Sequence, residues 1–171
     1  DGKDILKGMC FHIEAHDKLA VTGVNGAGKS TLLKQIIGEE QPDSGSITIP
    51  KDARIGYLSQ NMDADSEKSI YDEVISIKQD VIDMEQELRN LELSMQSDQS
   101  DALMKRYSEL SHRFELENGY AVRSSVTGIL KGLGFKEDEF TKKVSLLSGG
   151  QKTRLALGRL LLDAPDILIL D

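Results

Sequence analysis

The sequence contains a single cysteine, Cys10, which excludes an internal disulfide and is typical of a protein from a reducing compartment. No apolar run approaches the roughly 20 residues that a membrane-spanning helix requires. The N-terminus lacks the basic and then apolar layout of a signal peptide. We therefore expect a soluble, cytoplasmic protein with no membrane segment. Cys10 stands between Met9 and Phe11, and we expect it to be a small buried side chain.

The acidic charge is concentrated in one segment of the chain. The 171 residues carry a formal net charge of −8, but residues 61–120 hold fifteen Asp and Glu against six Lys and Arg, a net of −9. The remaining residues have a net charge of +1. This asymmetry argues against a nucleic-acid-binding surface on the acidic segment, and we expect no direct DNA partner. A basic protein partner is compatible with it.

A glycine-rich loop lies near the start of the chain. Residues 23–31 read GVNGAGKST and have the form G-x-x-x-x-G-K-[ST], after an alternating apolar stretch and before a helical pattern. Gly23, Gly26 and Gly28 lack a Cβ, so the loop can turn its backbone N–H groups toward a polyphosphate. Lys29 can then reach the β- and γ-phosphates, and the Ser30 hydroxyl can join the coordination shell of Mg²⁺. The sequence therefore predicts a phosphate-binding loop.

Short alternating or apolar stretches predict strands at residues 5–14, 18–22, 46–49, 53–60 and 167–170. The last of these is continuously apolar, which is typical of a parallel strand buried on both faces. Asp171 follows it, at the end of the strand where open α/β sheets bind their ligands. A carboxylate at this place suits Mg²⁺.

The middle of the chain carries two apolar stripes at heptad spacing. The first predicts one long helix, and the second, after a polar break at residues 97–100, predicts a helix that returns antiparallel. Asn118 and Gly119 are expected to close this hairpin. Two helices lying on a globular core remain an alternative, and a further helix is predicted over residues 120–133. The stripes consist of Ile70, Val74, Ile77, Val81, Met84, Leu88, Leu91 and Met95, and of Leu103, Tyr107, Leu110 and Phe114.

A second distinctive stretch, LSGGQ at residues 147–151, precedes a helical pattern that Pro165 ends. Ser148 is expected to be the N-cap, and Gly149 and Gly150 leave the start of the helix sterically open. An anion could bind there. A capped helix without a ligand explains the same residues, so the physical chemistry alone leaves both interpretations open.

Four motifs together resemble the Walker A motif, Q-loop, signature motif and Walker B strand of ATP-binding cassette (ABC) ATPases: residues 23–31, Gln60, residues 147–151 and the apolar run into Asp171. The predicted hairpin and the sequence of residues 147–171 are most similar to the first, arm-bearing cassette of the ABC-F proteins. These are soluble, tandem-cassette ATPases that act on ribosomes.

The resemblance implies an α/β fold: a P-loop NTPase core of the ABC type with a parallel sheet, an antiparallel β edge, and a helical subdomain that carries an α-hairpin coiled-coil insertion. It divides one cassette into a core at residues 1–62, an arm at residues 63–120, and residues 121–171 with the signature and Walker B strand.

The resemblance also implies the roles of individual residues. Lys29, Gln60 and Asp171 would be catalytic, and Ser30, Gln60 and Asp171 would hold Mg²⁺. Ser148, Gly149, Gly150 and Gln151 would contact ATP bound by a second cassette, in the same polypeptide or in a dimer. The ATP phosphates would be held by Gly23, Asn25, Gly26, Ala27, Gly28, Lys29, Ser30 and Thr31.

The resemblance leaves several functions open. The family's catalytic glutamate, switch histidine and adenine-stacking aromatic residue are not among these residues, so we expect this stretch alone to bind nucleotide weakly and not to turn it over. The longer tandem-cassette protein that the resemblance implies would hydrolyse ATP. Its acidic arm would contact a basic ribosomal protein. The alternatives are the cassette of an ABC transporter, a DNA-repair ATPase with a coiled coil, and a scaffold that binds ATP without hydrolysing it.

Overall fold

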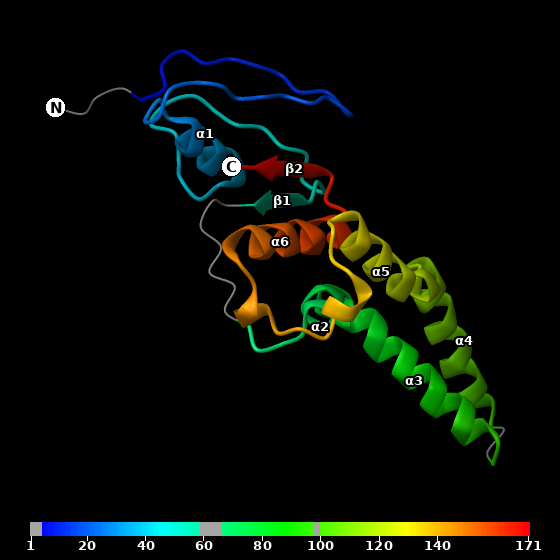
Figure 1. Cartoon of the computed structure of the whole chain (residues 1–171). Helices are drawn as coiled ribbons and strands as arrows, with labels where there is room; N and C mark the ends of the chain where they lie inside the picture. Colours follow the sequence, from blue (N-terminus) through cyan, green and yellow to red (C-terminus); the bar gives the residue numbers. More distant parts are fainter. Residues whose placement is uncertain (1–4, 59–65, 98–99) are drawn as a thin grey trace. The chain divides into compact units, whose positions relative to one another are not determined.

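A computed structural model describes residues 5–58, 66–97 and 100–171 of the chain. The chain forms two compact units, and each is described by itself. The first unit comprises Asp1–Gln60 and Asp166–Asp171, and the second comprises Asn61–Pro165. Figure 1 shows the elements of both.

The sheet of the first unit consists of two parallel strands, β1 (Ile55–Leu58) and β2 (Ile167–Leu170). The register pairs Ile55 with Ile167 and Leu58 with Leu170, so the carboxyl ends of both strands meet at one edge. The backbone N–H of Asp171 donates to the carbonyl of Leu58 at 3.0 Å. This bond extends the ladder by one step and fixes the backbone of Asp171 beside the end of β1.

The strands predicted at residues 5–14, 18–22 and 46–49 are not formed in the described part of this unit, and the expected antiparallel β edge is absent there. A strand is stabilised by a hydrogen-bonded neighbour and by burial of one face. Among the described residues these segments pair with no strand of the sheet, and Phe11, Leu19 and Ile47 are 46%, 60% and 42% exposed, so neither condition is met. The prediction that Cys10 is buried is also wrong, since its side chain is exposed.

Helix α1 (Lys29–Ile37) follows the glycine-rich loop, as the sequence predicts. Gly28 and Gly38 flank it in left-handed conformations, with φ of 94° and 84°, which glycine adopts without steric cost. The helix buries Leu32. Lys29 and Ser30 therefore occupy its first turn.

In the second unit the predicted long helix is interrupted. It forms α2 (Ile70–Ile75), a 3₁₀ turn (Ser76–Lys78) and α3 (Gln79–Met95). The Ser76 hydroxyl donates to the Glu73 carbonyl at 2.9 Å and so offers the backbone a local partner at the break. Heptad spacing alone predicts a continuous helix, because it records which residues are apolar and not how the backbone is capped.

The predicted antiparallel return is confirmed by α4 (Asp101–Leu116), which packs along α3 (Figure 1). We call α3 and α4 the hairpin. Both stripes face inward: the buried residues are Val81, Met84, Leu88 and Leu91 of α3 and Leu110 and Phe114 of α4. Arg106 forms an ion pair with Glu87 across the two helices.

The hairpin ends at a turn that requires glycine, as predicted for Asn118 and Gly119. Asn118 adopts a left-handed conformation with φ of 53°, and Gly119 is buried. A Cβ on Gly119 would lie 2.1 Å from the ring of Phe114. The close approach lets the phenylalanine ring cover the start of the next segment, which begins with a 3₁₀ turn (Gly119–Ala121).

Helices α5 (Val122–Gly132) and α6 (Gly149–Asp163) pack against α2 around a common apolar core. Two 3₁₀ turns, Glu137–Glu139 and Val144–Leu146, connect these helices. The most deeply buried side chains of the unit are Ile70, Val74, Val81, Val126, Leu130, Val144 and Leu155.

Glu73 of α2 is the one charged side chain that is buried among the described residues, at 7% exposure. One carboxylate oxygen accepts a hydrogen bond from Arg159 of α6 at 2.6 Å, and the other accepts one from the Ser66 hydroxyl at 2.8 Å. Burying a charge is costly unless it is paired and hydrogen-bonded, and both oxygens meet that requirement. Glu73 thereby joins α2, α6 and the segment before α2.

Two segments far apart in the sequence are hydrogen-bonded where α2 begins. Residues 66–71 pair with residues 140–145 through four backbone bonds of 2.9–3.1 Å, and Ser69 and Lys143 form an antiparallel bridge. This pairing joins the start of the segment that contains α2, the hairpin and α5 to its end.

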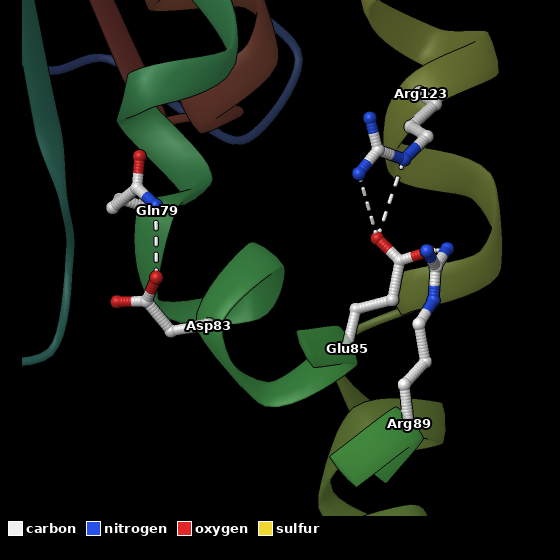
Figure 2. A network of polar contacts seen from close by, with 5 residues as sticks. All are labelled: Gln79, Asp83, Glu85, Arg89 and Arg123. Atoms are coloured by element: carbon white, nitrogen blue, oxygen red, sulfur yellow. Dashed lines mark hydrogen bonds and ion pairs between the residues drawn. The ribbon is translucent and has the colours of Figure 1, made fainter. Parts of the chain in front are cut away.

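A second polar junction links the hairpin to α5 (Figure 2). The carboxylate of Glu85 on α3 accepts hydrogen bonds from Arg123 of α5 at 2.9 and 3.2 Å, and from Arg89 of α3 at 2.5 Å. The hydrogen bond from Arg123 is the main reason that the pKa of Glu85 lies below its ordinary value. The ionised carboxylate therefore holds the base of the hairpin against α5.

Candidate nucleotide-binding site

The phosphate loop, residues 23–28, has the backbone that its glycines predict. Gly26 and Gly28 have φ of 80° and 94°, in the region that side chains other than glycine rarely adopt. A Cβ on Gly28 would also lie 2.6 Å from the side chain of Ile5. The N–H of Ala27 donates to the carbonyl of Val24 at 3.1 Å and closes the turn. The loop leads directly into the N-terminus of α1, where N–H groups without intrahelical partners favour an anion.

Lys29 folds back over this loop. Its ammonium group donates to the carbonyls of Gly23 at 2.9 Å and Val24 at 3.1 Å. The positive charge is thus held at the mouth of the loop by two neutral acceptors. Because a phosphate is a stronger acceptor than a carbonyl, an entering polyphosphate can take these bonds over.

Ser30 and Asp171 meet at the carboxyl end of β2. The Ser30 hydroxyl donates to Oδ1 of Asp171 at 3.0 Å, although the two residues are 141 positions apart. Both residues are predicted to bind the same Mg²⁺. The structure brings their oxygen atoms within hydrogen-bond distance, inside one compact unit.

Tyr57 is a polar neighbour of this pair that no sequence motif predicts. It lies on β1, and its hydroxyl donates to Oδ2 of Asp171 at 3.3 Å. Burial and the negative charge of Asp171 raise the pKa of Tyr57, so the hydroxyl stays protonated and can donate. The signal was available in principle: parallel pairing of the predicted strands sets Tyr57 opposite Ile169, two residues before Asp171.

These residues fit a Mg²⁺–nucleotide. A hydroxyl and a carboxylate are the hard oxygen donors that Mg²⁺ prefers, and the ion usually takes only one or two carboxylates besides phosphate and water. Within the part of the chain that the structure describes, no three His, Cys, Asp or Glu residues gather around a possible metal position. The hydroxyl of Ser30 and the carboxylate of Asp171 suit a metal that is held jointly with phosphates.

The signature residues belong to the second unit and confirm the expected cap. Ser148 is the N-cap of α6, and its hydroxyl accepts from the N–H of Gln151 while the Gln151 side chain accepts from the N–H of Ser148 at 3.0 Å. A Cβ on Gly149 or Gly150 would meet no atom within 4 Å beyond the neighbouring residues and the backbone of its own helix. The start of α6 is therefore sterically open.

The remaining predicted site residues have simpler placements. Asn25 is exposed on the phosphate loop, and Thr31 follows Ser30 in α1. Gln60 lies outside the described residues, so its predicted link to the metal stays a prediction. The structure thus brings Lys29, Ser30 and Asp171 to one loop and one strand end.

Comparison with known proteins identifies the family. The family model described as "ABC transporter" matches residues 6–171, nearly the whole chain. The chain belongs to this family. It is an ABC ATPase domain, and such cassettes bind ATP with Mg²⁺ and hydrolyse it. The matched range includes the loop of residues 23–31 and the strand that leads to Asp171.

The relatives of this cassette include members of the ABC-F group. It is 42% identical over 170 residues to the ATP-binding protein YdiF of Bacillus subtilis, covering 98% of this chain and 26% of YdiF. It is 28% identical over 176 residues to ABC transporter F family member 5 of Arabidopsis thaliana, covering 99% of this chain and 25% of that protein. The cassette thus spans about a quarter of the length of these relatives. The predicted resemblance to ABC-F cassettes is confirmed.

A solved structure supports the fold. The crystal structure of a complex of archaeal ribosomal stalk protein aP1 and ribosome recycling factor aABCE1 is similar to the cassette with a TM-score of 0.51 and 26% identity. The similarity covers 85% of this chain and 20% of that one. None of the helices in the described part of the cassette is long and apolar enough to cross a membrane.

Proposed function

We propose that the cassette is the nucleotide-binding and ATP-hydrolysing module of a cytoplasmic ABC-F-type protein that acts on the ribosome. The observation that carries the nucleotide part is the meeting of Ser30 and Asp171, 3.0 Å apart, beside the phosphate loop over which Lys29 lies. Bound Mg²⁺ would supply charge neutralisation at the β- and γ-phosphates. Ser30 and Asp171 would hold it with Gln60, and Lys29 would bind the phosphate oxygens.

The partner in hydrolysis is a second cassette. The open, capped start of α6 suits a phosphate that approaches from outside the cassette, because Gly149 and Gly150 present no side chain to it. Ser148, Gly149, Gly150 and Gln151 would contact ATP held by that second cassette. The division into core, arm and signature region at residues 62/63 and 120/121 is part of the same proposal.

Titration of the protein with ATP tests the nucleotide part. We expect ATP to bind more tightly in Mg²⁺ than in EDTA, because Ser30 and Asp171 add metal ligands to the phosphate contacts. Adenosine, which carries no phosphate, should bind far more weakly under both conditions. Equal affinities for ATP and adenosine, measured by isothermal titration calorimetry, would contradict a phosphate site at this loop.

The hairpin supports the ribosomal part of the proposal. It lies in the acidic segment of the sequence, and its apolar stripe is occupied by contact between its own two helices. Its outer faces are therefore left for a partner, and their charge favours a basic protein over bare RNA. ABC-F relatives and the resemblance to a recycling factor crystallised with a ribosomal stalk protein favour the ribosome as that partner.

Co-sedimentation with ribosomes tests this part. A variant in which a Gly-Ser turn replaces residues 90–107 keeps the buried base of the hairpin, including Leu88, Leu110 and Phe114. We expect this variant to lose most of the binding that the full chain shows in ATP, while its affinity for ATP is unchanged. Unchanged co-sedimentation would remove the hairpin from the proposal, and recovery of the protein with a membrane partner would favour a transporter cassette instead.

A further inference from the structure

The Walker B aspartate is held by two hydroxyl groups from two different elements. Ser30 of α1 donates to Oδ1 at 3.0 Å, and Tyr57 of β1 donates to Oδ2 at 3.3 Å. The backbone of Asp171 is fixed separately by its bond to Leu58. Each carboxylate oxygen thus has its own donor, and the two donors approach from α1 and from the neighbouring strand.

Two donors on different oxygens restrict the rotation of a carboxylate that one donor would leave free. Ser30 alone could keep its bond with either oxygen of Asp171. Tyr57 removes that freedom, because its hydroxyl occupies Oδ2 and leaves Oδ1 toward Ser30. The parallel register of β1 and β2 holds the backbone of Tyr57 opposite Ile169, and from there its hydroxyl donates to Asp171.

We propose that Tyr57 is a positioning residue for the Mg²⁺ site, acting through Asp171. The inference rests on the proposed binding of Mg²⁺–ATP and adds a residue to it. Tyr57 would not touch the metal or the nucleotide. It orients the carboxylate that does, as hydrogen-bonded neighbours of metal ligands commonly do.

The test measures how much Mg²⁺ strengthens ATP binding, as the ratio of the dissociation constants in EDTA and in Mg²⁺. Tyr57→Phe keeps the ring and removes only the hydroxyl. We expect it to reduce this ratio roughly tenfold, the usual scale for losing a partner of a metal ligand, and to leave ATP binding in EDTA unchanged. Tyr107→Phe is the matched control, because it removes a similar bond, from the Tyr107 hydroxyl to Glu92 at 3.0 Å, in the hairpin.

A double-mutant cycle shows whether Tyr57 acts through Asp171. In an Asp171→Asn background, Tyr57→Phe should change the ratio little. An equal loss of binding in EDTA and Mg²⁺ would mean that Tyr57 serves packing, and a full effect in the Asp171→Asn background would mean that it acts elsewhere. Either result overturns the inference, as does an unchanged ratio in Tyr57→Phe. If the wild-type protein gains nothing from Mg²⁺, the proposed function fails and the inference with it.

Discussion

Lys29→Ala is expected to weaken ATP binding by roughly 30-fold or more. Truncating one member of a hydrogen-bonded charge pair typically costs about 2–5 kcal/mol, and each 1.4 kcal/mol is a factor of ten. Among the residues that the structure describes, the Lys29 ammonium group donates only to the loop carbonyls of Gly23 and Val24. The variant should therefore unfold at the same denaturant concentration as the wild type, so that its loss of binding is not a loss of folding.

Lys34→Ala is the matched control for this result. Lys34 lies on the same helix, and its ammonium group forms a partly exposed ion pair with Glu40 at 3.6 Å, of the kind that contributes little to stability. We expect the affinity of Lys34→Ala for ATP, measured by isothermal titration calorimetry, to equal that of the wild type. Lys29 would lose its role if both variants bound ATP alike, whether tightly or weakly.

Glu73→Ala should lower the free energy of unfolding by about 3 kcal/mol. Breaking a buried ion pair costs about 3–5 kcal/mol, and the lower value applies because the Arg159 side chain remains 35% exposed and can be partly hydrated. The variant also leaves the Ser66 hydroxyl without its acceptor at 2.8 Å. Guanidinium unfolding followed by circular dichroism measures the change, with the slope of the transition checked for a loss of cooperativity.

Two further variants decide whether burial is the cause. Glu67→Ala breaks an exposed ion pair with Lys143, and we expect this variant to unfold at nearly the same denaturant concentration as the wild type. Glu73→Leu combined with Arg159→Met removes both charges, and we expect it to be more stable than Glu73→Ala because no charge is left without its partner. A double variant as unstable as Glu73→Ala would show that the lost stability has another origin.

The features that the sequence predicts correctly are those encoded locally. The glycines of the phosphate loop, the cap at Ser148 and the turn at Asn118 and Gly119 each need particular residue types at fixed spacing. The two apolar stripes likewise predict which faces of α3 and α4 are buried. In all these cases the feature depends on interactions between residues that are close together in the sequence, so the sequence pattern is enough to predict it.

The features that sequence reasoning missed depend on partners distant along the chain. Glu73 and Arg159 are 86 positions apart, and Tyr57 and Asp171 are 114 apart. No periodicity marks such a pair, because only the fold makes the two residues neighbours. The predicted strands at residues 5–14 and 18–22 failed for a related reason: alternation shows that a segment can form a strand, but a ladder also needs a neighbour.

The pairing of residues 66–71 with residues 140–145 has a consequence for how the length of the hairpin can change in evolution. The pairing joins the two ends of the intervening segment where they leave and re-enter the rest of the second unit. For a flexible loop, each doubling of the length between such fixed ends costs only about 0.6 kcal/mol, and added helix that buries its own apolar face can recover it. Whole helical turns can therefore be gained or lost at the tip of the hairpin. The length of the hairpin can then change in evolution without a change in the nucleotide-binding residues.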